Sequence, residues 1–192
     1  MNTPAHLIFG AAAFGRPGRP EVTTAAILGA LLPDLSLYLM VGWAMLVRGI
    51  DAQVIFDRMY FSDAWQAVFA VDNSMPLWGV VLAIGLWRRW PVLVACAGAG
   101  LLHLIFDFGL HNEDARRHFW PISDAVFRSP FSYWDRNHHG QIIGPLEIVV
   151  SLALCGLLWR RFTGRLARGL IVLAALAEAV PGALFTLMVH AA

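Results

Sequence analysis

The sequence predicts an all-α protein, a polytopic membrane helical bundle in which residues 1–192 form a single integral membrane domain. The first reason is composition, because 58% of the residues are hydrophobic and only 14% are charged, against about 25% charged residues in a typical soluble domain. The mean hydropathy is +0.62. The second reason is that several apolar runs are long enough to cross a bilayer core of about 30 Å. The third is that short arginine-rich turns alternate with longer polar loops along the chain.

The apolar runs define about five membrane spans. They cover residues 22–47, 73–87, 91–110, 142–159 and 170–189. Before them, Thr3 and Pro4 offer a hydroxyl N-cap followed by proline at the first helical position, and Gly15 ends a helix that is too short to cross. We expect this short N-terminal helix to be only partly inserted and covered by other helices. Residues 48–72 mix apolar and acidic side chains and predict an interfacial helical segment, either one helix or a helix pair.

Charge and cysteine usage exclude several classes of protein. The net charge is +1, so no nucleic-acid partner is expected. Cys96 and Cys155 both lie in apolar runs and are interpreted as small buried hydrophobic residues rather than as a disulfide or a thiolate metal site. The positive-inside rule puts the arginine-rich turns in the cytoplasm. Residues 48–72 and 111–141 then face the outer side of the membrane.

The central stretch of the chain, residues 101–121, begins in an apolar run and ends in a polar loop. His103 and Asp107 are four residues apart, so on a helix their side chains share one face and can reach one metal ion. His111 continues that face, and His118 follows in the loop. The alternative is that His103 and Asp107 only hydrogen-bond each other in the core. We favour a functional role, because ionisable residues inside a membrane span usually have one.

Asp34 is a second intramembrane candidate. It follows Pro33 inside the first predicted span, and proline removes a backbone donor and leaves polar backbone beside the carboxylate. The alternative is a loop between two shorter helices, with Asp34 as a cap. Because apolar residues flank Asp34 on both sides, we interpret it as a ligand or a base.

Several ionisable residues share one depth in the membrane. Counted at about 1.5 Å per residue from the arginine-rich turns, they lie about 15–24 Å inward, in one layer slightly beyond the middle. The residues of this layer are His6, Asp34, His103, Asp107, Glu147 and Glu178. Buried charges are costly unless they are paired or bind metal. A shared layer therefore predicts convergence on one site that is open to the outer face.

This layer carries a nitrogen and oxygen ligand set without a thiolate, which suits a divalent transition metal. Zinc is favoured, and manganese, iron and nickel stay open. The predicted metal ligands are His6, Asp34, His103, Asp107 and His118. A metal there would lower the pKa of a water to about 7 and generate a nucleophile. Glu147 or Asp72 is the predicted general base, and His111 or His118 a further ligand or the donor to the leaving group. His138 and His139 have a weaker claim, because adjacent loop histidines are usually solvated.

Four motifs in order carry a family resemblance. T-x-A-H-L-x-F-G covers Thr3 to Gly10, and G-A-L-L-P-D covers Gly29 to Asp34. H-L-x-x-D covers His103 to Asp107, and F-W-P covers Phe119 to Pro121. In order and spacing the chain resembles the bacterial inner-membrane metal-dependent hydrolase family, the LexA-regulated type. The resemblance implies metal-dependent hydrolysis in the bacterial inner membrane, with the matched His and Asp residues as the site.

The chain departs from the family pattern before the central helix. The family has a T-H-S motif there, whereas this chain has Asp72, Asn73 and Ser74, without the histidine. The resemblance therefore implies neither a second metal nor the same substrate for this chain. The resemblance does not extend beyond Pro121.

Three functions remain open at this point. The first is a membrane-embedded hydrolase whose metal-activated water attacks an ester, phosphoester or amide of a lipid-linked or membrane-soluble substrate. The second is an ion, metal or small-solute transporter that uses the same buried layer as a relay. The third is a non-catalytic membrane scaffold. A transporter more often has inverted repeats, and none is visible here, so the hydrolase is favoured. The substrate, the metal and the oligomeric state stay open.

Overall fold

We analysed a computed structural model of the chain, which describes the backbone of residues 1–191 and the side chains of residues 1–181. Its elements are, in order, α1 (Thr3–Phe14), α2 (Pro20–Gly42), the π-helical turn η1 (Trp43–Val47), α3 (Ala52–Val54), the π-helical turn η2 (Ile55–Met59), α4 (Asp63–Asp72), α5 (Met75–Trp87), α6 (Pro91–Leu110), the 3₁₀ turn η3 (Arg136–His138), α7 (Gly140–Arg161) and α8 (Arg165–Ala191). Every regular element in this part of the chain is helical, so the predicted fold class is confirmed.

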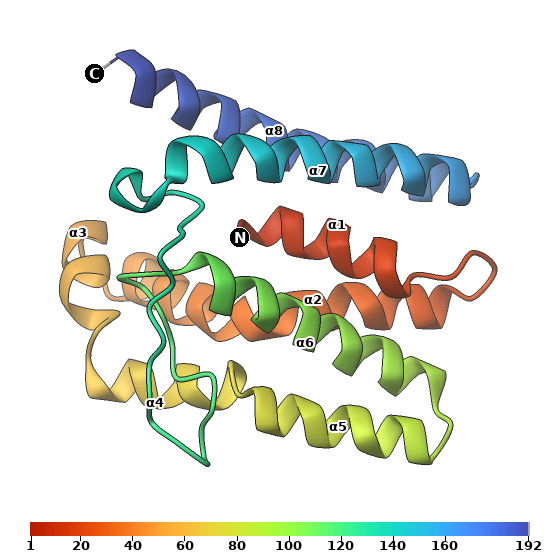
Figure 1. Cartoon of the computed structure of the whole chain (residues 1–192), viewed down its shortest axis with the longest axis horizontal. Helices are drawn as coiled ribbons and strands as arrows, with labels where there is room; N and C mark the ends of the chain where they lie inside the picture. Colours follow the sequence, from red (N-terminus) through yellow and green to blue (C-terminus); the bar gives the residue numbers. More distant parts are fainter. Residues whose placement is uncertain (192) are drawn as a thin grey trace.

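The short helix α1 lies at the centre of the bundle (Figure 1). It contacts α2 and α6 on one side and the α7–α8 hairpin on the other, while α6 packs between α2 and α5. This arrangement covers a helix of only 12 residues with longer ones, as expected for a segment that cannot span a bilayer alone.

Four stretches are long and apolar enough to cross a membrane, judged over the residues that the structure describes. They are Pro20–Val47, Asp63–Trp87, Pro91–Leu110 and Gly140–Arg161. The second stretch differs from the sequence interpretation, because α4 joins α5 with only Asn73 and Ser74 between them. Residues 63–72 therefore belong with a span. The last predicted span, residues 170–189, lies within α8.

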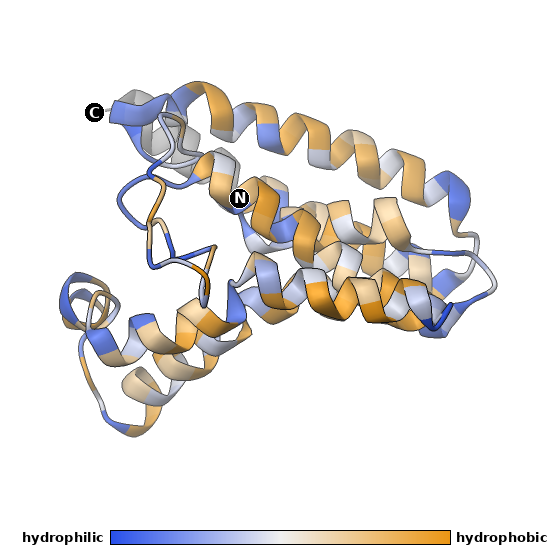
Figure 2. Ribbon diagram, turned by 60° about the horizontal axis from the view of Figure 1, so that its bottom comes forward, coloured by the Kyte–Doolittle hydropathy of each residue, from blue (hydrophilic) through white to orange (hydrophobic). Residues whose placement is uncertain are grey.

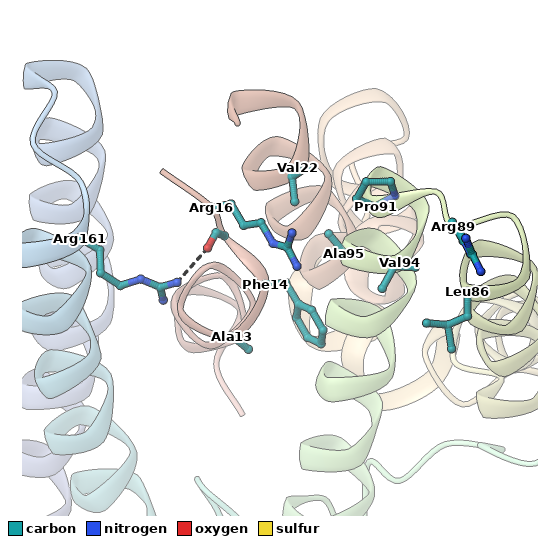
Figure 3. A pocket seen from close by; sticks show the side chains of 11 residues that line it. Ala13, Phe14, Arg16, Val22, Leu86, Arg89, Pro91, Val94, Ala95 and Arg161 are labelled. Carbon is teal, nitrogen blue, oxygen red and sulfur yellow. Dashed lines mark hydrogen bonds between the residues drawn. The ribbon is translucent and has the colours of Figure 1, made fainter. Parts of the chain in front are cut away.

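The arginine-rich turns gather at one end of the molecule (Figure 1), and hydrophobic residues occupy most of the helices between the two ends (Figure 2). At that end Arg16, Arg89 and Arg161 line a cavity of about 380 Å³ (Figure 3). Arg161 donates to the carbonyl oxygens of Ala12 and Gly15 at 2.6 and 3.1 Å, which ties α7 to the end of α1. The loop of residues 111–135 lies at the opposite end.

Small residues let the central helices approach closely. A Cβ atom at Gly29 of α2 would overlap the backbone of Cys96 in α6, and one at Gly98 would overlap the ring of Phe14. Glycine is required where backbones come this near. Between these contacts, a core of small apolar side chains joins α2 to α6: Val22, Ala26, Ala30, Ala95 and Ala99. The close packing brings the polar residues of α1, α2 and α6 together.

Helix α2 continues through Pro33 without interruption. The alternative of a loop with Asp34 as a helix cap is therefore wrong. Asp34 is buried within the helix, and the side-chain amide of Asn73 donates to the carbonyl oxygen of Pro33 at 3.3 Å.

Candidate metal centre

His6, His103 and Asp107 meet in the interior of the bundle. His6 Nε2 lies 2.9 Å from Asp107 Oδ1, and His103 Nε2 lies 3.0 Å from Asp107 Oδ2. Each residue offers one ligand atom, and these atoms all lie within 4.8 Å of one another. All three residues are at least 96% buried, with 2%, 1% and 4% of their surface exposed. Two imidazoles from different helices thus face one carboxylate in a water-poor interior.

A hydrogen bond on the side of the His103 ring that faces away from Asp107 fixes the tautomer of the imidazole. His103 Nδ1 lies 2.7 Å from the carbonyl oxygen of Ala30, and a carbonyl oxygen can only accept, so Nδ1 carries the proton. In the neutral ring Nε2 is then an acceptor that faces the Asp107 carboxylate. Two acceptors 3.0 Å apart need a cation or a proton between them. A backbone carbonyl behind a ligating imidazole is the usual support of a metal-binding histidine.

Asp34 stands at the edge of this cluster. Its Oδ1 atom lies 3.7 Å from His103 Nε2 and 3.6 Å from the guanidinium of Arg116. Its Oδ2 atom accepts from the Thr3 hydroxyl at 2.7 Å, and that hydroxyl lies 2.7 Å from the hydroxyl of Tyr38. Asp34 therefore lies beside the three-residue cluster and is held by partners from two other segments.

Arg116 is a buried cation beside the cluster. Its side chain is 6% exposed, donates to Asn73 Oδ1 at 2.9 Å and to the Tyr60 hydroxyl at 3.4 Å, and lies over the Phe69 ring at 4.9 Å. A guanidinium held in this way is preorganised to bind anionic oxygens.

His111 joins the cluster from the end of α6. Its Nε2 atom lies 3.1 Å from Asp107 Oδ1, and its Nδ1 atom lies 2.7 Å from Asp114 Oδ2. Trp134 Nε1 donates to the same Asp114 oxygen at 3.2 Å. Burial lowers the pKa of His111, but the carboxylates of Asp107 and Asp114 outweigh it and hold that pKa above its ordinary value. Asp107, His111 and Asp114 thus form a continuous carboxylate–imidazole–carboxylate chain.

A cavity of about 500 Å³ adjoins the cluster at the end opposite the arginine-rich turns. Asp34, Asp107, His111, Asp114 and Arg116 contribute to its wall. Tyr38, Tyr60 and Tyr133 line it as well. The carboxylates, one imidazole and the guanidinium are therefore accessible from this cavity.

The structure separates three predicted site residues from this cluster. His118 is buried, and burial lowers its pKa. Its Nδ1 atom donates to the Asn73 carbonyl oxygen at 3.2 Å. Glu147 accepts from the Asn2 backbone amide at 2.8 Å, and the carbonyl oxygen of Asp72 accepts from Trp78 Nε1 at 2.8 Å. Within the described part of the chain, no hydrogen bond or ion pair joins these three side chains to His6, His103 or Asp107.

The remaining histidine pair lies apart from the cluster. His138 Nδ1 lies 2.5 Å from Asp135 Oδ2 in the loop before α7. His139 is exposed and has a positive φ of 66° as the cap residue of α7. The exposed position of His139 agrees with the solvated alternative, whereas His138 is partly buried and bound to Asp135.

Sequence reasoning did not select several residues that surround the cluster. Arg116 and Asp114 stand in a polar loop without periodicity, where charged residues usually face solvent. Thr3 was interpreted only as a helix cap, but no cap hydrogen bond forms at the start of α1, and its hydroxyl serves Asp34 instead. Asn73 was visible only as the departure from the family motif.

The F-W-P segment has a structural role at this end of the bundle. The backbone amide of Met75 donates to the His118 carbonyl oxygen at 2.9 Å, and the Ser74 hydroxyl donates to the Trp120 carbonyl oxygen. The segment thus docks the loop on the first turn of α5.

The geometry defines a buried His/Asp cluster in a bundle of membrane-type helices, with a composition compatible with a metal site. Comparison with known proteins adds no assignment, since no family model, no curated protein and no solved structure matches the chain.

Proposed function

We propose that the protein is a membrane-embedded metal-dependent hydrolase. The observation that carries this proposal is the convergence of His6, His103 and Asp107 within 4.8 Å, next to a cavity that contains acidic, imidazole and guanidinium groups. His6, His103 and Asp107 would hold a divalent metal, and Asp34 would complete the set. The donor set of two imidazoles with carboxylates favours zinc, with manganese, iron or nickel as alternatives.

A divalent metal in this set would supply a water activated for nucleophilic attack. The residues around it divide the other tasks. The carbonyl of Ala30 holds His103 in the tautomer that binds through Nε2. His111 faces the cavity and is backed by Asp114, which is the arrangement of an oriented general base. His111 therefore replaces Glu147 and Asp72 as our candidate base.

Among esters, phosphoesters and amides we propose a phosphoester, because Arg116 lies buried at the cavity wall and guanidinium groups bind phosphate oxygens. With the metal bound, the water oxygen would bond to phosphorus as the P–O bond to the leaving group breaks. His111 Nε2, which faces Asp107 Oδ1 at 3.1 Å in the structure, would turn to the water and take its proton, and the departing oxygen would take that proton up. Arg116 stabilises the negative charge on the remaining phosphoryl oxygens.

We also propose the setting implied by the family resemblance, the inner membrane of a bacterium. The arginine-rich turns at one end of the bundle support a cytoplasmic position for that end. The metal centre would then open toward the outer side.

One observation favours an ion relay as the second candidate function. Glu178 of α8 is 1% exposed, and both of its carboxyl oxygens lack a hydrogen-bond partner among the described residues. Glu147 Oε2 and the Ser151 hydroxyl of α7 share this condition. Unpaired acids at membrane depth also occur in proton and cation pathways.

Hydrolysis by purified protein tests the proposal. We expect the metal-loaded protein to cleave methyl p-nitrophenyl phosphate, His103→Ala to abolish the cleavage, and His139→Asn, in the exposed loop, to leave it unchanged. If wild-type protein with bound metal cleaves no phosphoester, ester or amide, the hydrolase proposal fails and the relay takes its place.

A further inference from the structure

A second cavity of about 500 Å³ runs along the outside of α1, between α2 and the α7–α8 hairpin. Its wall is almost entirely apolar. Leu7, Ile8 and Ala11 of α1 line it on one side, and Leu170, Ala174 and Ala177 of α8 on the other. We call this cavity the apolar groove. Because it lies among helices of the membrane type, hydrocarbon rather than water would surround it in a bilayer.

The apolar groove and the polar cavity at the metal centre share part of their walls. Thr3 and Tyr38 line both. Their hydroxyl groups lie 2.7 Å apart, and the Thr3 hydroxyl also donates to Asp34 at 2.7 Å. At this pair of hydroxyl groups, the apolar lining of the groove gives way to the polar lining of the cavity, which contains carboxylate, imidazole and guanidinium groups. Tyr38 is 52% exposed, so the junction is accessible.

The two cavities therefore fit the two halves of one amphiphile. We propose that the apolar groove binds the hydrocarbon chain of a lipid phosphoester, whose head group enters the polar cavity beside Asp107 and Arg116. The proposal rests on the proposed hydrolase function and adds its substrate class. Thr3 and Tyr38 would contact the linkage between chain and phosphate.

The length of the apolar groove agrees with the length of the hydrocarbon chain of a membrane lipid. Its wall on α2 extends from Thr23 to Tyr38, which at about 1.5 Å per residue is roughly 22 Å. The groove runs away from the metal centre and toward the end with the arginine-rich turns, so a chain bound in it lies parallel to the lipid chains around it. The substrate could then enter sideways from the bilayer without exposing its chain to water.

Chain binding would position the phosphorus rather than add hydrophobic energy, because the chain is already in hydrocarbon before it binds. A misplacement of the reacting atoms by about 1 Å can cost about 10²-fold in rate. Obstruction of the groove should therefore slow the cleavage of long-chain substrates and spare short-chain ones.

The test compares methyl and hexadecyl p-nitrophenyl phosphate, which have the same leaving group. Ala177→Trp places a bulky ring in the groove, and Ala83→Trp places the same ring on an exposed face of α5 that lines no described cavity. We expect Ala177→Trp to lower kcat/KM for the hexadecyl ester about 10²-fold and to leave that for the methyl ester unchanged. Ala83→Trp should change neither value.

Photolabelling gives a second readout that needs neither turnover nor a folded variant. A non-hydrolysable hexadecyl phosphonate with a diazirine near the chain end should label α1 and α8 of the wild-type protein at the groove residues. The lipid-chain proposal is overturned if labelling of the groove is no stronger than labelling of α5, or if both tryptophan variants cleave the two esters alike. In either case, cleavage of the methyl ester would still support the hydrolase proposal. If the groove is labelled and neither ester is cleaved, the lipid site stands and the hydrolase proposal fails.

Discussion

The imidazole rings of His6 and His103 lie stacked, with centroids 3.5 Å apart and an interplanar angle of 10°. One ring belongs to α1 and the other to α6, and both direct Nε2 at the same carboxylate, that of Asp107. The two rings would repel each other if both carried a proton on each nitrogen. A divalent cation bound opposite Asp107, as proposed above, would hold the two rings in this parallel arrangement.

The approach of α2 to α6 is the packing condition for this geometry. Gly29→Ala should destabilise the protein by about 1–3 kcal/mol, because the added methyl group meets the backbone of Cys96 and overpacking costs this much. Thermal unfolding in detergent measures the effect. Gly79→Ala in α5 is the control, since its Cβ would meet nothing within 4 Å, and it should be neutral or stabilise by up to about 1 kcal/mol. Equal stability of the two variants would contradict the close packing.

Membrane topology follows from the two ends of the bundle. In a background with Cys96 and Cys155 replaced by alanine, Arg88→Cys and Ser123→Cys should react with a membrane-impermeant maleimide from opposite sides of the membrane. Both positions are exposed. Labelling of both from the same side would refute the alternation of basic turns and outer loops.

Arg116 should act on the charge of the substrate. Arg116→Lys keeps a cation beside Asp34 but loses the planar fork, so metal content should be retained while kcat falls about 10²-fold, the effect of one oriented donor. The neighbouring Arg117 is paired with Asp124 at 3.5 Å on the surface. Arg117→Lys should therefore change neither quantity. A normal rate in Arg116→Lys would remove the guanidinium from the mechanism.

His111 and Glu147 are rival candidates for the general base. His111→Gln should lower kcat by about 10²–10⁴-fold, the usual contribution of a base. Glu147→Gln should lower it less than about tenfold, because Glu147 binds the backbone of Asn2 and does not contact the cluster. Rates measured at full metal loading decide between them, and the reverse order would restore Glu147 as the base.

The helical spacing of the ionisable residues and their depth in the membrane predicted a large part of the candidate metal centre. The spacing of His103 and Asp107 put both on one helix face, and a common distance from the basic turns related them to His6 and Asp34 on other helices. The structure brings these four residues together. The same depth argument also included Glu147 and Glu178, because depth carries no information on the direction of a side chain around its helix.

The polar loop was harder to predict for a physical reason. Residues 111–135 form no regular helix, so no periodicity indicates which side chains face inward. The side chains of Arg116 and Asp114 point inward and contact Asp34 and His111, respectively. The His118 side chain instead binds the backbone of Asn73. The continuity of α4 and α5 was missed because only Asn73 and Ser74 separate them, and two polar residues resemble the end of an interfacial segment.

Metal content tests the central claim most directly. The protein is purified in detergent, loaded with zinc, freed of excess metal and analysed by inductively coupled plasma mass spectrometry. We expect tightly bound zinc in the wild type and in His139→Asn, and its loss in both His6→Ala and His103→Ala, because each variant removes one imidazole facing Asp107. Wild-type protein that binds no transition metal, or His6→Ala and His103→Ala proteins that bind as much as wild type, would contradict a metal centre at these residues.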